Sequence, residues 1–230
     1  MAAPTGRGVF SGQMRRSLPA SLLGQDPGSS LLLDERSRPD FRDLYGRHAA
    51  AAASLCAAVR RVRLGGIDLE AEEIGRLQSL RLLVGEANAL DLSAEADTLA
   101  ADPSRRARLS MLAALLDDGR LEVRVAPLAG WSPDFSVFLP PSDVSGGGAR
   151  GAPPGPIRSH APILMVGTHW FERPFPHPGP ALGAVFHGEP ALVAFRRFEE
   201  TWRTGHDLAG PIRAILKDAL DRTAVRLRPG

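Results

Sequence analysis

Histidines are the side chains of this sequence best suited to chemistry near neutral pH, and they cluster late in the chain. Five of the six lie after residue 159, namely His160, His169, His177, His187 and His206. Imidazole serves as a nucleophile, a general acid or base, and a zinc ligand. None of these spacings is a zinc motif. We therefore expect no metal or cofactor, and we keep His160 and His169 as alternative catalytic residues beside the interpretation that all five are surface imidazoles.

A candidate pocket lies at Gly167-Thr168-His169-Trp170-Phe171. A strand that ends in glycine leaves backbone N–H groups available, and Thr168 and His169 add polar groups beside them. The alternative is that Trp170 and Phe171 simply fill the core.

The single cysteine, Cys56, lies in an apolar stretch with no histidine or aspartate in register, so a buried structural thiol is favoured over a nucleophile. One cysteine also excludes an internal disulfide and a cysteine-rich zinc site.

Charge and composition favour a globular protein without a dominant nucleic-acid footprint. The net charge is +2 and 43% of the residues are hydrophobic. Arginines alternate with acids, as in Arg196, Arg197, Glu199 and Glu200, which is typical of a solvated helix face. No apolar run approaches the roughly 18 residues of a membrane span, and no secretory signal is visible. We therefore expect a cytoplasmic protein with no membrane contact.

The chain divides by composition into an arm and one domain. Residues 1–38 are rich in Gly, Ser, Pro and Arg and predict a flexible, disordered arm. Residues 39–230 predict one domain, with a Gly/Pro-rich loop insertion at 140–159. A long helix is expected from Pro39 through Val59, because alanine-rich segments favour helices.

Further elements alternate between helix and strand, which predicts an α/β layered domain. Strands are expected at 81–84, 121–125, 162–167 and 181–187, and helices from Asp68, over 102–119, over 190–205 and over 211–220. The helix at 102–119 has the clearest signals, since Asp102 can cap it, Pro103 suits its first position and Gly119 ends it.

The second half of this order resembles the second half of a phospholipase D-like domain. The likeness rests on Asp134-Phe-Ser-Val-Phe138, Ile163-Leu-Met-Val-Gly-Thr168, Leu182-Gly-Ala-Val-Phe186 and Phe198-Glu-Glu-Thr-Trp202. The resemblance implies a layered sheet flanked by helices. It covers about residues 40–208, and its closing Phe-x-x-x-Trp pattern matches the family ending.

The resemblance also places the family's catalytic motif, His-x-Lys, on this chain in a degenerate form. Asp134 falls at the histidine position and Ser136 at the lysine position, while Gly167-Thr168 falls at the later Gly-Ser position. An aspartate there faces a phosphate with negative charge, and a serine supplies no cation. The only lysine, Lys217, lies in a terminal helix. A remnant cleft lined by Asp134, Ser136, Thr168 and His169 is therefore expected to bind a ligand without catalysis.

Three functions follow as hypotheses. The first is a non-catalytic sensing or scaffolding subunit, by analogy part of a prokaryotic, bacterial nucleic-acid-processing or defence assembly, forming a homodimer or joining a larger enzyme partner. The second is a phosphodiesterase or nuclease that uses His160 or His169. The third is a DNA-associated regulator whose arm contacts phosphate through Arg7, Arg15 and Arg16.

Overall fold

One mixed β-sheet organises the part of the chain that the computed structural model describes, which is residues 30–33, 38–61, 63–66, 76–87, 89–127, 134–141, 161–167 and 183–226. Eight strands within these residues follow the order β1-β7-β6-β5-β2-β3-β4-β8. Their bounds are β1 Ser30–Leu33, β2 Ser54–Arg61, β3 Ser79–Glu86, β4 Leu121–Val125, β5 Asp134–Leu139, β6 Ile163–Val166, β7 Gly183–His187 and β8 His206–Asp207.

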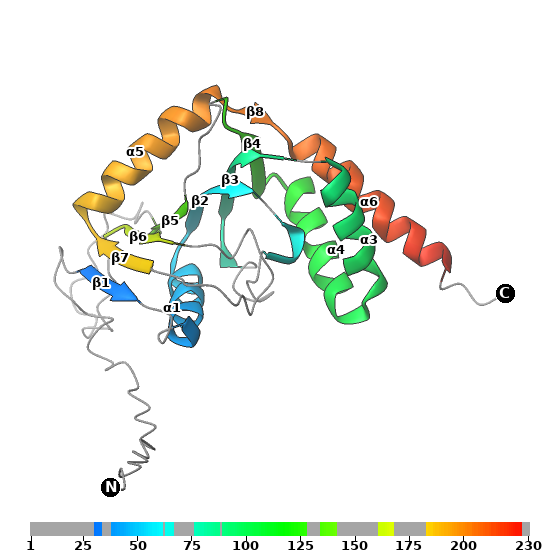
Figure 1. Cartoon of the computed structure of the whole chain (residues 1–230), viewed down its shortest axis with the longest axis horizontal. Helices are drawn as coiled ribbons and strands as arrows, with labels where there is room; N and C mark the ends of the chain where they lie inside the picture. The colour runs from blue at the N-terminus through cyan, green and yellow to red at the C-terminus, as the bar shows by residue number, and fades with distance from the viewer. Residues whose placement is uncertain are drawn as a thin grey trace, which may run out of the picture.

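Helices flank this sheet, as Figure 1 shows. They are α1 Arg38–Ala51, α3 Ala89–Ala101, α4 Pro103–Asp117, α5 Glu189–Thr204 and α6 Ala209–Arg226, with a short 3-10 turn, η3, at Leu64–Gly66. The expected α/β class, a layered sheet flanked by helices, is confirmed. None of the described helices is long and apolar enough to cross a membrane.

The sheet has a parallel part and an antiparallel part that meet between β2 and β5. Strands β2, β3 and β4 run parallel to one another. Strand β5 pairs with β2 antiparallel, and β6 and β7 continue that alternation. Parallel strands are usually covered on both faces, and β2 and β3 are accordingly nearly continuous apolar runs. Five residues are buried in β2 and four in β3.

Alternation along the central strands divides the core into two clusters. On β2, Leu55, Ala57 and Val59 pack in the cluster that contains residues of α1, α3, α4 and α6. The intervening Cys56 and Ala58 belong to the second cluster, with Phe198 and Trp202 of α5. Side chains alternate between faces because the strand repeat is two residues. Helix α5 therefore covers one face, and the other helices cover the opposite one.

The expected helix from Pro39 through Val59 is wrong in its second half. Helix α1 ends at Ala51, and β2 begins at Ser54. Residues Leu55 to Val59 are almost fully buried, because helices or neighbouring core residues cover both faces of the strand. A short apolar run of this kind fits a buried helix and a buried strand equally well from pattern alone.

Local signals predicted helix α4 correctly. Asp102 accepts hydrogen bonds from the Ser104 backbone N–H at 2.9 Å and from its hydroxyl at 2.7 Å, and Pro103 opens the helix. Gly119 has φ of +68°, a left-handed conformation that suits glycine after a helix. The preceding helix, α3, was not expected from the sequence.

The last part of the expected arm at residues 1–38 contains a short strand. Ser30–Leu33 form β1, which pairs antiparallel with β7 and so satisfies backbone hydrogen bonds of both strands. Residues 1–29 lie outside the described part, as do residues 142–160 of the expected loop insertion. Strands β5 and β6 on either side of that insertion are paired in the same sheet.

Candidate functional site

Ser136, the residue at the lysine position of the expected motif, lies beneath α1 inside the core. Its side chain is 0% exposed, and its Oγ is 3.1 Å from the Tyr45 hydroxyl oxygen, either of which can donate. Tyr45 comes from the middle of α1 and also packs edge-on against Phe138, with ring centroids 4.9 Å apart. Ser136 is expected to line the remnant cleft, and in the structure its side chain is buried against Tyr45 of α1.

Asp134 begins β5 two residues earlier and is half-buried. Its backbone carbonyl accepts a hydrogen bond from the Gly167 N–H at 2.9 Å, and Gly167 has φ of +83°. The structure thus brings Asp134 beside the residue that directly precedes Thr168. Thr168, His169 and His160 themselves lie outside the described residues, so the grouping of Asp134 with Thr168 and His169 stays a prediction.

Two histidines approach each other on the α1 face of the sheet. His48 of α1 and His187 at the end of β7 have ring centroids 6.4 Å apart, and His48 also contacts Phe138 at 5.7 Å. Burial, with smaller contributions from the neighbouring His187 and Arg47, lowers the pKa of His48 to about 4. Burial also lowers the pKa of His187. Both imidazoles are therefore neutral at pH 7 and serve packing in this interior position.

The α5 face holds a charged residue within an aromatic cluster. Arg81 forms an ion pair with Glu199 at 2.6 Å, and its guanidinium lies within 5.4–5.8 Å of the ring centroids of Phe195, Phe198 and Trp202. Its Nη2 also lies 3.2 Å from the Cys56 sulfur. Burial raises the pKa of Cys56 to about 11, so this thiol is a structural group, as expected.

A groove that the sequence did not predict lies between α3, α4 and the segment after β2. It has a volume of about 510 Å³. Its polar lining consists of Arg63, Asp91, Glu95, Thr98, Arg105 and Arg108, and its apolar lining of Leu64, Gly65, Ala94, Leu99, Leu109 and Leu112. Ligands of open α/β sheets bind at the carboxyl ends of parallel strands, and the groove begins two residues beyond the end of β2.

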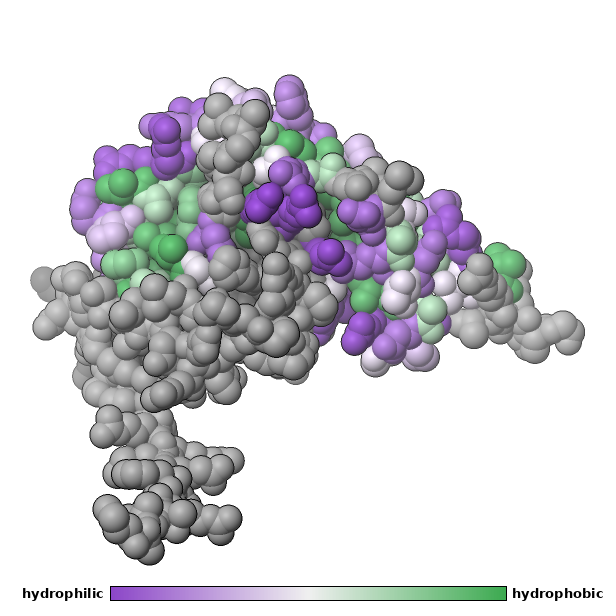
Figure 2. All heavy atoms as spheres, viewed as in Figure 1, coloured by the Kyte–Doolittle hydropathy of each residue, from purple (hydrophilic) through white to green (hydrophobic). Residues whose placement is uncertain are grey.

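Regular helix spacing creates the two walls of this groove. Asp91, Glu95 and Thr98 lie on one stripe of α3, and Arg105, Arg108 and Leu112 lie on one stripe of α4. Polar and apolar side chains are interspersed over this helical part of the surface, as Figure 2 shows. The signal in the sequence was the i, i+3 pair of arginines in α4, but only the fold brings Arg63 beside it.

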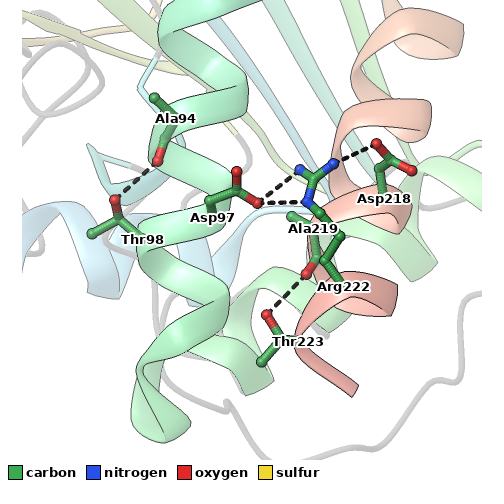
Figure 3. A network of polar contacts seen from close by, with 7 residues as sticks. All are labelled: Ala94, Asp97, Thr98, Asp218, Ala219, Arg222 and Thr223. Carbon is green, nitrogen blue, oxygen red and sulfur yellow. Dashed lines mark hydrogen bonds and ion pairs between the residues drawn. The ribbon is translucent and has the colours of Figure 1, made fainter. Parts of the chain in front are cut away.

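Helix α6 holds the opposite stripe of α3 and so fixes the outer wall of the groove. Arg222 donates to Asp97 Oδ1 at 2.7 Å through Nη2 and to Asp218 at 2.7 Å through Nη1, as Figure 3 shows. In the same view, Thr98 donates to the Ala94 carbonyl at 2.9 Å on the groove-lining stripe. Helix α3 can therefore contact α6 through one stripe and a ligand in the groove through the other.

The described residues contain no group of three or more His, Cys, Asp or Glu side chains arranged to hold a metal ion.

Comparison with known proteins gives remote structural likenesses. No family model matches the sequence, and no curated protein matches it. Among solved structures, Nuc from Salmonella typhimurium, a phospholipase D family member, is similar with a TM-score of 0.44 and 10% identity, over 79% of this chain and 98% of that chain.

Two further solved structures are similar at the same level of identity. One is TrmBL2, an archaeal chromatin protein, with a TM-score of 0.42 and 10% identity over 85% of this chain and 57% of that one. The other is phosphatidylserine synthase from Haemophilus influenzae Rd KW20, with a TM-score of 0.40 and 10% identity over 87% of this chain and 46% of that one. This chain thus spans about half the length of these two proteins.

Proposed function

We propose that this protein is a non-catalytic sensing or scaffolding subunit built on a degenerate phospholipase D-like domain. The observation that carries the proposal is the position of Ser136, which is fully buried and hydrogen-bonded to Tyr45. A catalytic lysine at that point of β5 would have to reach a phosphoryl oxygen. The serine instead joins α1 to the sheet through Tyr45. This position therefore contributes to stability and supplies no positive charge to a substrate phosphate.

The order of elements after β5 supports the domain type. Strands β5, β6 and β7 follow one another as antiparallel neighbours, and α5 then packs on the sheet. Phe198 and Trp202 of α5 stack with ring centroids 5.4 Å apart, which gives the Phe-x-x-x-Trp ending a packing role. These residues are the ones on which the resemblance rests.

A subunit of this kind acts through a ligand or a partner. We propose that Asp134, together with Thr168 and His169, borders a remnant cleft where β5 begins. Ligand binding in this cleft would act on a second copy of the chain or on a larger enzyme. Nucleic acid remains a further candidate partner through the arginines at Arg7, Arg15 and Arg16.

Turnover assays test the non-catalytic role directly. The purified chain is incubated with a chromogenic phosphodiester and with single-stranded DNA, alongside His160→Ala, His169→Ala and the exposed control His206→Ala. We expect no turnover from any of the four proteins. Hydrolysis that persists in His206→Ala but disappears in His160→Ala or His169→Ala would refute the proposal and establish the nuclease or phosphodiesterase hypothesis.

A further inference from the structure

The groove between α3, α4 and η3 has the size and the lining of a small-molecule site. Its volume of about 510 Å³ lies within the range of roughly 300–1,000 Å³ that is usual for such sites. Its apolar lining includes the exposed Ala94 of α3, together with the more buried Leu99, Leu109 and Leu112. Charged side chains belong to the same lining, so one ligand can contact both kinds of surface.

Three arginines line the groove from two separate segments. Arg105 and Arg108 come from one stripe of α4, and Arg63 comes from the segment that follows β2. The guanidinium group is planar and presents paired N–H donors that match the oxygens of a phosphate. Arg105 also forms an ion pair with Asp102 at 3.4 Å, with both side chains well exposed, so solvent already weakens that competing contact.

One of the two acids in the groove is already engaged by the backbone. The Glu95 carboxylate accepts the Leu64 N–H through Oε2 and the Gly65 N–H through Oε1, both at 3.0 Å. These bonds fix η3 against α3 and offset the negative charge of Glu95 locally. Gly65 permits this approach, since a Cβ there would lie only 3.3 Å from Oε1.

The second acid and a hydroxyl add a different specificity. Asp91 lies in the exposed first turn of α3, and Thr98 lies two turns further along the same stripe. A carboxylate accepts hydrogen bonds from hydroxyl groups but repels phosphate. A ligand that pairs with all of these groups therefore has its phosphate beside the arginines and its hydroxyl groups beside Asp91.

We propose that this groove binds a small organic phosphate monoester that also carries hydroxyl groups and an apolar ring or skeleton. The phosphate contacts Arg63 and Arg105, the hydroxyls contact Asp91, and the apolar part lies against Ala94 and Leu99 of α3. This inference rests on the proposed function in one respect, since it supplies a ligand for a sensing subunit. Asp134 of β5 is not among the residues that line the groove.

Calorimetric titration of the full chain tests the proposal with adenosine 5′-monophosphate as the probe. Comparison with adenosine measures the contribution of the phosphate group. Comparison with inorganic phosphate measures the contribution of the ribose and the adenine ring. The double variant Arg63→Gln, Arg105→Gln removes two guanidinium groups, while Arg196→Gln on α5 is the matched control for an exposed arginine that already has an acidic partner. Far-UV circular dichroism establishes that each variant is folded.

We expect saturable binding of the monophosphate, and weaker binding of adenosine and of inorganic phosphate. The double variant should weaken monophosphate binding by about a hundredfold or more, because each of the two guanidinium groups contributes about tenfold or more through a charge-assisted hydrogen bond. Arg196→Gln should bind as the unmodified protein does. Replacing the same two arginines by lysine should give intermediate affinity, because charge is retained and the paired N–H geometry is lost.

Several outcomes would overturn the inference. They are absence of saturable monophosphate binding, equal affinity for adenosine and monophosphate, equal affinity for inorganic phosphate and monophosphate, or unchanged affinity in the folded double variant. These results are distinguishable from failure of the proposed function. That failure is detected as histidine-dependent phosphodiester hydrolysis, and it does not depend on Arg63 or Arg105.

Discussion

Replacing Trp202 by alanine should destabilise the protein by about 4 kcal/mol. The indole is 5% exposed and stacks on Phe198 with an interplanar angle of 17°. Truncating a buried tryptophan typically costs about 3–5 kcal/mol, because the lost burial is joined by a cavity. Two guanidinium groups lie over the same ring, that of Arg124 at 4.8 Å and that of Arg81 at 5.5 Å from its centroid. Their attraction places the estimate above the low end of the range.

Urea titration followed by circular dichroism measures this free energy of unfolding. Trp202→Phe is the graded variant, since a smaller ring can still stack on Phe198, and it should lose clearly less stability than Trp202→Ala. Arg203→Ala, one residue along α5 and exposed, is the matched control and should stay within about 0.5 kcal/mol of the unmodified protein. A loss below about 1 kcal/mol for Trp202→Ala would refute the placement of α5 on the sheet and the family resemblance that depends on it.

Two more substitutions test the α1 face. The pKa of His48 is lowered from 6.5 to about 4 in the folded protein. Between pH 6.5 and pH 4, His48 is therefore protonated in the unfolded chain but neutral in the folded protein. Stability should therefore fall by about 3 kcal/mol as pH drops from 6.5 to 4, with no further loss from this group below 4. His48→Gln should flatten that slope when stability is measured across this range, His206→Gln should not, and equal slopes in both variants would contradict the assignment. Ser136→Ala should destabilise the protein by about 1 kcal/mol, because the hydrogen bond to Tyr45 is lost. Urea titration measures this change, and a stability equal to that of the unmodified protein would show that Ser136 does not hold α1 on the sheet.

The sequence predicted those elements whose causes are local. Asp102, Pro103 and Gly119 define α4 through capping and backbone conformation, and each acts on its nearest neighbours. Phe198 and Trp202 recur at helical spacing, so their shared burial was also predictable and is confirmed.

Elements determined by distant parts of the chain were not predictable in the same way. The alanine-rich stretch before Ser54 is helical, yet Leu55 to Val59 form a strand because β3 and β5 pair with it on both sides. Burial of Ser136 depends on the position of Tyr45, which lies far away in the sequence. The groove depends on three separate segments, so its arginines could be counted in the sequence but not grouped.

The pairing of β1 with β7 has a consequence for the order in which the protein assembles. Ser30 pairs with Phe186, so β1 can find its partner only after all the residues between them have been made. The parallel strands β2, β3 and β4 follow one another closely and can associate with α3 and α4 well before β7 emerges. Closure of such a long loop carries an entropic cost that only a preformed sheet can offset. We therefore expect β1 to join last and to become the edge strand in place of β7. With only four residues, β1 is a short edge strand, which limits pairing of the finished sheet with other chains.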